Sequence, residues 1–462
     1  MPAGVAAGHP ATAEVALRVL GAGGSAADAA VAAVLTCSAT ESILTGIGGG
    51  GFATYYDAAT RTVTCLDFFC SVPGLDGTEP GPMVPVEINF GGMRLPYSIG
   101  AASVGVPGVP AGCGEVHRRW GRLPWQRVVA PAISLAHSGV VLPAPQARTL
   151  ESVAPALLPG EGAGIYAPTG RLLDGGDLLY HRGLDQALAA LAEDGPAVFY
   201  TGKLGELLVD AVRAGGGALG PADLAAYRVL ELPVERATLG GGQVFGRHDL
   251  NGTIATIAAL PADLATRPRP ERAVAVAGAL REYGRQKLGD TTNVSVVDLD
   301  GNACVITTTL GVGAGVWLPG YGINLNSMLG EGELITPDLA PGRRMSSMMC
   351  PVVVVDGDGH LVVAAGSAGA SRIRTALLDT LLGVLIDGLD MPAAVARSRF
   401  HVVDDTVHAE LGYPEDELAA LADAGYTVNR WDELNHYFGG VSAVGLAGAA
   451  GDPRRGGVGL LL

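Results

Sequence analysis

The chain has 462 residues, of which 48% are hydrophobic and 5% aromatic. This length fits two domains or one large α/β unit, and the hydrophobic fraction allows a substantial core. The formal net charge is −16 and the pI is about 4.9, which argues against nucleic acid or an anionic membrane surface as a partner. A small anionic substrate stays compatible with this charge if the chain builds a local cationic pocket.

The six cysteines form no CxxC pair and have no histidine at zinc-ligand spacing, so reduced thiols are expected. The first residues lack a basic stretch followed by an apolar run, and no apolar stretch is long enough to cross a bilayer. No signal peptide and no membrane span are therefore predicted. We expect a cytoplasmic protein, and nothing in the pattern calls for a metal or an organic cofactor.

Two helices are predicted within residues 10–36. Apolar residues recur at helical spacing up to the glycine cluster at 21–24, which ends the first helix. Ser25 is expected to cap an alanine-rich helix over 26–35, with Asp28 in its first turn.

A strand over 53–56 follows a glycine-rich loop, and the chain from about 110 to 230 then alternates helical stretches with Gly/Pro breaks. Residues 125–136 are predicted to form a helix that is broken or kinked at Pro131. A further helix is predicted over 183–192.

Residues 232–259 are mixed and glycine-rich, and 271–287 have the pattern of an amphipathic helix. The residue pattern then becomes that of a hairpin, in which strands 292–298 and 304–309 flank a tight turn at 300–301.

A second hairpin is predicted from strands 351–355 and 361–365 around an acidic, glycine-rich turn, and a helix over about 372–387 follows it. Helices, a mixed middle, then hairpins and helices together favour a large α+β sandwich.

Thr291 stands at the start of the first hairpin, directly after Asp290. A threonine hydroxyl is weakly nucleophilic unless a base accepts its proton. The threonine's own α-amine, with a pKa of roughly 8, can be that base near neutral pH, but it exists only once the Asp290–Thr291 bond is cut. A threonine pair at a strand start is equally typical of plain β-propensity, so these residues by themselves leave both interpretations open.

Short sequence blocks spread over nearly the whole chain carry a more specific signal. They occupy residues 23–30, 47–52, 105–108, 202–227, 290–298, 300–302, 345–348, 366–372, 399–401 and 452–454. In order and number these blocks resemble the γ-glutamyltransferase (γ-glutamyl transpeptidase) family. The resemblance implies a four-layer αββα sandwich of the N-terminal-nucleophile hydrolase type. It also implies self-cleavage between Asp290 and Thr291 into fragments 1–290 and 291–462, which stay together as one unit.

The resemblance assigns roles by position. Thr291 matches the processing threonine, and Thr309 matches the threonine that hydrogen-bonds the nucleophile after cleavage. Gly369 and Ala370 match a Gly-Gly pair whose backbone amides form the oxyanion hole, where each donor is commonly worth about 3 kcal/mol. Ala370 keeps the amide, so the hole is retained if the backbone tolerates a Cβ. A plain turn before the next helix is the alternative for this pair.

Several positions depart from the family pattern. The arginine that holds the α-carboxylate of the γ-glutamyl group is Phe69 here, which cannot imitate a bidentate clamp. An asparagine that helps to hold the substrate amine is Gly311. Met328 stands where an amide is usual, Glu331 offers the one comparable acid, and the histidine after the two threonines is Asn293.

Ser346 and Ser347 persist, and the resemblance places them in the carboxylate pocket; a polar turn before the next strand is the alternative. Arg343 or Arg344 is also a candidate to bind a carboxylate, with a structural role equally open for either.

These losses concern recognition, whereas the positions that carry the chemistry remain. A similar drift occurs in a family subgroup that accompanies 4-alkyl-L-proline units of lincomycin- and anthramycin-type antibiotics and is associated with carbon–carbon hydrolysis of an oxalyl-type fragment. We therefore expect a self-processing threonine hydrolase that cuts a small carboxylated biosynthetic intermediate. The alternatives are a γ-glutamyl hydrolase or transferase acting on glutathione-like donors, and a catalytically silent descendant.

Overall fold

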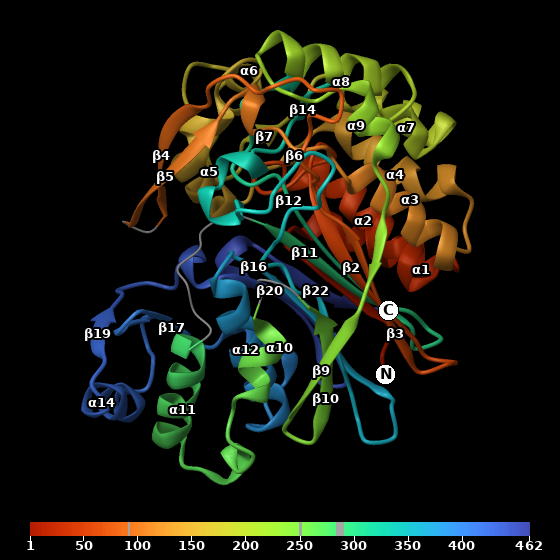
Figure 1. Ribbon diagram of the computed structural model, residues 1–462. Helices are drawn as coiled ribbons and strands as arrows, with labels where there is room; N and C mark the ends of the chain where they lie inside the picture. The colour runs from red at the N-terminus through yellow and green to blue at the C-terminus, as the bar shows by residue number, and fades with distance from the viewer. Residues whose placement is uncertain (91–92, 249–251, 283–290) are drawn as a thin grey trace.

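The computed structural model describes residues 1–90, 93–248, 252–282 and 291–462. A seven-stranded antiparallel sheet lies at its centre (Figure 1). Its strands, in spatial order, are β22 (Val458–Leu461), β1 (Gly4–Ala7), β11 (Thr292–Val297), β12 (Ala303–Thr309), β2 (Gly50–Asp57), β3 (Thr62–Phe68) and β8 (Leu230–Leu232).

A six-stranded sheet packs against one face of the first sheet. Its strands, in spatial order, are β21 (Gly448–Gly451), β20 (Gly440–Gly445), β16 (Leu361–Ala368), β15 (Val352–Val355), β10 (Gly242–Arg247) and β9 (Val234–Leu239). Strands β11 and β12 lie over β16, and all their residues are buried because they have one sheet on one side and helices on the other.

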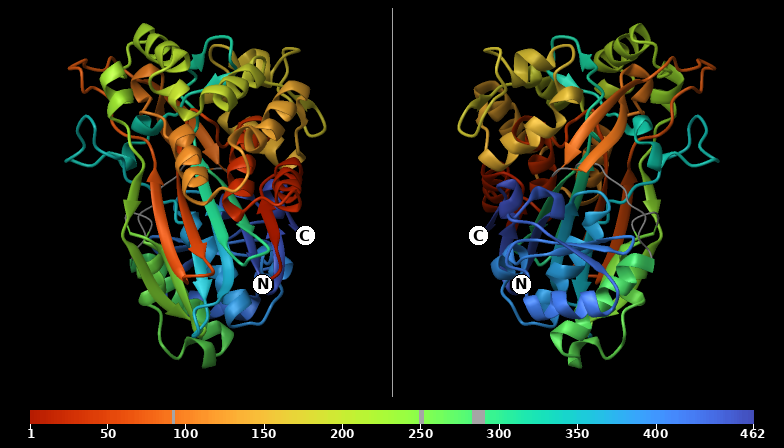
Figure 2. Two further views of the ribbon diagram at one scale, coloured as in Figure 1. Left: turned by 90° about the vertical axis from the view of Figure 1, so that its right-hand side faces the viewer. Right: turned by 90° about the vertical axis from the view of Figure 1, so that its left-hand side faces the viewer.

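Helices close both outer faces. The first sheet is covered by α1 (Pro10–Gly21) and α2 (Ala26–Thr40), and the second by α12 (Arg372–Leu385) and α13 (Met391–Ala396). The four layers are visible from the side in Figure 2. The expected αββα sandwich is therefore confirmed.

Most of the remaining helices pack beside α2 and toward one end of the sheets, in the upper part of Figure 1. They are α3 (Val109–Trp120), α4 (Trp125–Ser138), α5 (Ala144–Leu157), α6 (Gly162–Tyr166), α7 (Leu184–Asp194), α8 (Lys203–Ala214) and α9 (Pro221–Ala226). The opposite end carries α10 (Thr253–Ala258), α11 (Arg269–Glu282) and α14 (Glu415–Asp423). None of the helices in the described ranges combines the length and apolar character that crossing a bilayer requires.

Four smaller sheets complete the structure. They comprise β4 (Val84–Phe90) with β5 (Met93–Ile99), β6 (Val140–Val141) with β7 (Leu178–Leu179), β13 (Trp317–Leu318) with β14 (Ile323–Asn324), and β17 (Phe400–Val403) with β18 (Thr406–Ala409) and β19 (Thr427–Arg430).

The predicted elements recur with shifted ends. Ser25 caps α2 in a reciprocal capping box with Asp28, but the helix runs to Thr40 because its whole surface is buried and later residues still pack. Of the two alternatives predicted at Pro131, a break or a kink, the break is wrong, because α4 continues through Pro131 to Ser138. Helix α11 ends at Glu282 within the described residues, so the last residues of the predicted helix lie outside them.

Strands from both sides of the Asp290–Thr291 bond are interleaved within the first sheet. Strand β1 lies between β22 and β11, and β12 pairs with β2 along its full length. The two chain termini consequently lie side by side (Figure 1). Any cut after residue 290 would therefore leave two pieces that share one hydrogen-bonded sheet.

Candidate active site

Thr291 immediately precedes β11 and is 4% exposed. In the neighbouring hairpin register Thr292 lies opposite Thr308, so Thr291 stands at the level of Thr309, the last residue of β12. Both threonines line one small cavity of about 20 Å³. Asp290, on the other side of the predicted cleavage site, lies outside the described residues.

Thr309 has a defined local partner. Its Oγ1 accepts a hydrogen bond from the backbone N–H of Gly311 at 2.8 Å, which orients the hydroxyl at the point where β12 ends. The structure therefore brings the two predicted threonines together on adjacent strands, and both are fixed by buried backbone.

Gly369 and Ala370 link β16 to α12 on the opposite side of the cavity. Ala370 lines the cavity, whereas Gly369 does not. Both have left-handed backbone angles, with φ of +117° at Gly369 and +51° at Ala370. A side chain at 369 would place a Cβ 2.8 Å from Gly439 Cα, so glycine is required there, while Ala370 accepts a conformation that costs an L-residue about 1–2 kcal/mol.

The position of this pair suits anion binding. Gly369 and Ala370 lie at the N-terminal end of the 14-residue helix α12, where backbone N–H groups and the helix dipole favour negative charge. An oxyanion that develops next to Thr291 would lie on this side of the cavity, as the family resemblance implies.

The rest of the cavity wall is mainly apolar. Besides Thr291, Thr309 and Ala370, the lining residues are Phe69, Met328, Glu331, Leu334, Ser347, Met348, Met349 and Ile373. Of the predicted recognition residues, Phe69, Met328, Glu331 and Ser347 are therefore at the site. Ser346 is half-buried and does not line it.

Phe69 is fully buried and belongs to an aromatic stack rather than to a polar clamp. Its ring lies 5.5 Å from the ring of Phe52 at an interplanar angle of 27°. The guanidinium of Arg247 lies over Phe52, with Cζ 3.6 Å from the ring centre. This stack occupies the side of the cavity where the family resemblance places the arginine.

Arg247 is a site-supporting residue that the sequence did not reveal. It is 1% exposed and donates from Nη2 to the Ser347 carbonyl at 2.6 Å and from Nε to the Met349 carbonyl at 2.8 Å. It thus holds the backbone of a cavity wall about 100 residues further along the chain. A glycine-rich, mixed segment offered no signal for this contact.

The surroundings of Gly311 show why the asparagine of the family pattern does not fit at this position. Its φ is +71°, and a Cβ there would lie 2.7 Å from both Glu331 Oε1 and Ser327 Oγ and 2.9 Å from Met328 Cε. The side chains of Glu331 and Met328 therefore fill the space that a side chain at 311 would enter. Gly311 itself does not line the cavity.

Neither candidate arginine reaches the cavity. Arg343 is exposed and pairs with Asp338 at 3.1 Å. Arg344 lies 3.3 Å from Asp67, donates to the Phe69 carbonyl and stacks over Tyr227 at 4.6 Å. These contacts give Arg344 the structural role that the sequence left open.

Two buried residues with ionisable side chains contact the start of β11, and the sequence did not predict either contact. Glu41, at the end of α2, accepts a hydrogen bond from Thr292 Oγ1. On the other side Arg455 Nη1 lies 3.5 Å from the Thr291 carbonyl oxygen.

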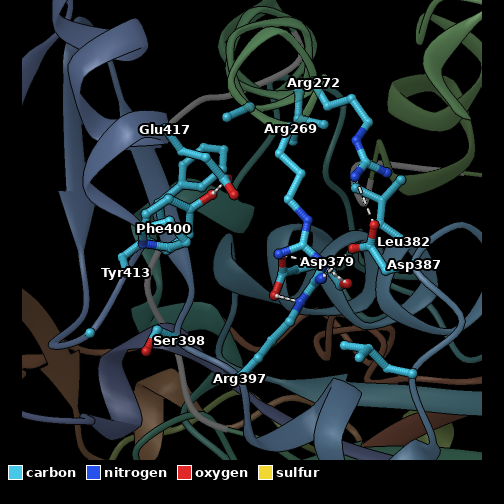
Figure 3. Close-up of a pocket in the computed structure, with 15 residues that line it drawn as sticks. Arg269, Arg272, Asp379, Leu382, Asp387, Arg397, Ser398, Phe400, Tyr413 and Glu417 are labelled. Atoms are coloured by element: carbon cyan, nitrogen blue, oxygen red, sulfur yellow. Dashed lines mark hydrogen bonds and ion pairs between the residues drawn. The ribbon is translucent and has the colours of Figure 1, made fainter. Parts of the chain in front are cut away.

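A larger cavity, of about 260 Å³, lies between α11, α12 and α14 (Figure 3). Its charged side chains are largely paired with one another. Arg397 contacts Asp379 at 2.7 Å and Asp387 at 2.9 Å, and Arg272 contacts Asp387 at 2.7 Å. These ion pairs join α11 and Arg397 to α12 and the residues just after it, and the cavity contains nothing comparable to the Thr291–Thr309 pair.

One cluster in the described ranges has metal-ligand geometry. Asp356, Asp358 and His360 lie at the tip of the β15–β16 hairpin, with both Asp358 and His360 exposed. Strand β16 runs from this tip to Ala368, next to Gly369, which separates the tip from the Thr291 cavity by about 23 Å at 3.3 Å per residue. The cluster is therefore not part of the Thr291 site.

Comparisons with known proteins agree with this geometry. A family model described as gamma-glutamyltranspeptidase matches residues 12–262 and 254–461. The glutathione hydrolase proenzyme of Bacillus subtilis (strain 168) is 26% identical over 91% of this chain and 84% of its own. The acylase ACY 1 proenzyme of Pseudomonas sp. (strain SE83) is 29% identical over 95% of this chain and 89% of its own.

Solved structures show the same fold. The cephalosporin acylase from Bacillus halodurans superposes with a TM-score of 0.80 at 21% identity, over 99% of this chain and 96% of that one. LmbA2991HD superposes with a TM-score of 0.79 at 20% identity, over 99% and 98%. The chain is a divergent member of the γ-glutamyltranspeptidase family, an enzyme of the N-terminal-nucleophile hydrolase type whose relatives are hydrolases and acylases.

Proposed function

We propose that the protein is a self-processing N-terminal-threonine hydrolase that cuts a carbon–carbon bond next to a carbonyl in a small carboxylated intermediate, releasing an oxalyl-type fragment. In this proposal Thr291 is the nucleophile, its freed α-amine is the base, Thr309 orients it, and the amides of Gly369 and Ala370 hold the oxyanion.

The observation that carries the proposal is the composition of the cavity around Thr291. Thr291, Thr309 and Ala370 meet there, and the rest of the lining is mainly apolar, with Phe69 and Met328 among its members and Glu331 and Ser347 as the polar ones. A γ-glutamyl group carries both an ammonium and a carboxylate close together, and neither Arg343 nor Arg344 lines this cavity to clamp the carboxylate. A flat, conjugated keto acid also carries a carboxylate but has no ammonium, so it places one charge fewer against these mainly apolar walls.

The chemistry balances with water as the only co-reactant. The α-amine accepts the Thr291 hydroxyl proton as Oγ attacks a ketone carbon beside the carboxylate, and the oxyanion forms against the α12 terminus. Collapse breaks the carbon–carbon bond, and the departing enolate takes the proton from the ammonium. Water, deprotonated by the same amine, then hydrolyses the ester on Thr291 and restores the hydroxyl.

The proposed cleavage fits the sheet topology. Strands of fragments 1–290 and 291–462 are interleaved in the first sheet, so the two pieces would remain one heterodimeric unit. The cavity of about 20 Å³ is close to the space of a single water molecule. We therefore infer that the chain moves around Thr291 when the bond is cut or when substrate binds.

The test compares two donors on the processed protein. 2,4-Dioxopentanoate should lose its conjugated absorbance and yield oxalate and acetone, with an oxalyl ester on the 291–462 fragment visible by rapid-quench mass spectrometry. γ-Glutamyl-p-nitroanilide should release little nitroaniline. A purified Thr291→Ala variant is the blank for both.

Rapid release of nitroaniline from γ-glutamyl-p-nitroanilide, with no acylation by the dioxo acid, would support the alternative of a γ-glutamyl hydrolase or transferase. The similarity to glutathione hydrolases favours that alternative. A processed protein that neither donor nor a wider panel of activated acyl compounds can acylate at Thr291 would support the silent descendant.

A further inference from the structure

Glu41 is a buried carboxylate in an unfavourable place. It is 0% exposed and caps the C-terminal end of α2, where the partial negative charge of the helix dipole repels an anion. Its partners among the described residues are uncharged hydroxyl and thiol groups. Burial of a carboxylate without a cation is costly. A contribution to folding stability therefore does not explain why a glutamate occupies position 41.

The surroundings of Glu41 are shaped to hold a carboxylate. Thr292 donates to Oε2, Thr12 donates to Oε1 at 3.1 Å, and the Cys37 thiol lies 3.3 Å from Oε1. A Cβ at Gly8 would lie 2.3 Å from Oε2, so the glycine leaves room for this oxygen. Burial raises the pKa of the Cys37 thiol, and the neighbouring carboxylate raises it further, which keeps the thiol protonated as a donor.

The pleat of β11 connects this carboxylate to the candidate nucleophile. Successive side chains of a strand point to opposite faces. Thr292, Val294 and Val296 face the α2 side, where both valines join the helical core, whereas Asn293 and Ser295 face the second sheet through Ser442. Thr291 therefore faces the cavity, and a hold on Thr292 sets the direction of Thr291.

A neighbouring pair provides an internal comparison. Thr308 lies directly opposite Thr292 on β12 and faces the same side, where Thr45 Oγ1 donates to its hydroxyl at 2.8 Å. This pair is buried to the same degree as Thr292. It anchors the adjacent strand through neutral groups. The Thr45 backbone N–H donates to the Glu41 backbone carbonyl at 3.1 Å, but neither hydroxyl of the pair is bonded to the Glu41 carboxylate.

We propose that Glu41 is a positioning residue that, through Thr292, fixes Thr291 for its attack; this rests on the function proposed above. In processing, Thr291 Oγ attacks the carbonyl carbon of residue 290 and its proton passes to the departing nitrogen as the C–N bond breaks. Water then hydrolyses the resulting ester and frees both the carboxyl and the hydroxyl. Glu41 touches none of these atoms and acts by alignment, for which small misplacements have large rate effects.

The experiment follows the conversion of full-length protein into fragments 1–290 and 291–462 by intact mass, in wild type, Glu41→Gln, Thr292→Val, Thr292→Ser and the Glu41→Gln/Thr292→Val double variant. Thr308→Val is the matched control. We expect conversion to slow at least tenfold in Glu41→Gln and Thr292→Val, to stay within about threefold of wild type in Thr292→Ser and Thr308→Val, and not to slow further in the double variant.

The outcomes are distinct. Wild type that stays whole would refute the proposed function itself. Wild type that is cut while Thr292→Val converts as fast as Thr292→Ser would overturn the role of Glu41 alone, even if Glu41→Gln failed to fold. Multiplied effects in the double variant, or equal slowing in Thr308→Val, would also overturn it, because they would show general damage to the strands.

Discussion

At the scale of single residues, Phe69 marks where this chain departs from its relatives. The side chain is fully buried, stacks on Phe52 and thereby on Arg247. An arginine at position 69 would supply a guanidinium, but the surrounding residues would still lack the arrangement that a carboxylate clamp requires. The proposed difference in recognition would therefore be distributed over the stack and the filled space at Gly311.

Phe69→Arg should consequently destabilise the fold by about 3–5 kcal/mol, because it removes a buried aromatic ring and buries a charge near an existing cation. Urea unfolding measures this, and Phe69→Leu, a milder change in the same stack, should cost about 1–2 kcal/mol. An arginine variant with wild-type stability and new γ-glutamyl turnover would show instead that a single side chain sets the specificity.

Ala370 tests the predicted oxyanion pair. Its φ of +51° is strained for alanine but natural for glycine, and glycine loses a comparable amount through backbone entropy. Ala370→Gly should therefore keep both activity and stability within about 1 kcal/mol. Ala370→Val should lose more than about 2 kcal/mol, since a β-branched residue is an outlier at this φ. Denaturant titrations that gave Ala370→Val the same free energy of unfolding as Ala370→Gly would contradict this prediction.

How far the sequence predicted the site depends on how local each contact is. Thr291 and Ala370 stand in the sequence blocks and Thr309 at the end of a predicted hairpin strand, and the structure brings all three together at one cavity. Arg247 and Glu41 escaped prediction because their roles come from partners about 100 and 250 residues away. Ser346 and Gly311, expected at the pocket, do not line it; at Gly311 the side chains of Glu331 and Met328 fill the neighbouring space.

At the scale of elements, hairpins and caps were predictable from local patterns, whereas the course of α4 through Pro131 was not. Packing of α4 against α2 and α7 offsets the hydrogen bond that proline removes. Tertiary contacts that no local window contains therefore decided this helix.

Beside the larger cavity, Arg397 binds Asp379 on α12 and Asp387 just after that helix (Figure 3). Arg397→Met should destabilise the protein by about 2–4 kcal/mol, because Asp379 and Asp387, 14% and 9% exposed, would lose their shared cation. The matched surface change is Arg430→Met, whose partner Glu415 is exposed and whose loss should cost under about 1 kcal/mol. Similar midpoints of unfolding for both variants would contradict this.

His181 joins the β13–β14 region to the segment after α2, and it should make stability depend on pH. Its Nδ1 lies 3.0 Å from the Gly322 carbonyl and its Nε2 2.7 Å from Ser42 Oγ. Burial lowers the pKa of His181 to about 4, so between about pH 6.5 and 4 the unfolded chain binds a proton that the folded chain does not.

Stability should therefore fall as pH drops through this window, by up to about 3 kcal/mol from this residue. Unfolding titrations at pH 7, 6, 5 and 4 should show a smaller loss in His181→Gln than in wild type. Parallel curves for the two proteins would mean that the imidazole is protonated in the folded state.

At the scale of the whole molecule, the resemblance of many small blocks indicated the architecture better than any single element did. The αββα order depends on pairings such as β1 with β11 and β22, which join residues almost 300 and more than 450 positions apart. No local pattern contains these pairings. They also place both ends of the chain and the start of β11 in one sheet, so cleavage before Thr291 is compatible with an intact fold.

The most direct test of the central claim is the intact mass of freshly purified full-length protein under denaturing conditions. The account predicts two species with the masses of residues 1–290 and 291–462, coeluting as one particle before denaturation, and a single uncut chain for Thr291→Ala. A wild-type protein that remains one chain of 462 residues after prolonged incubation would contradict the assignment of Thr291 as nucleophile and base.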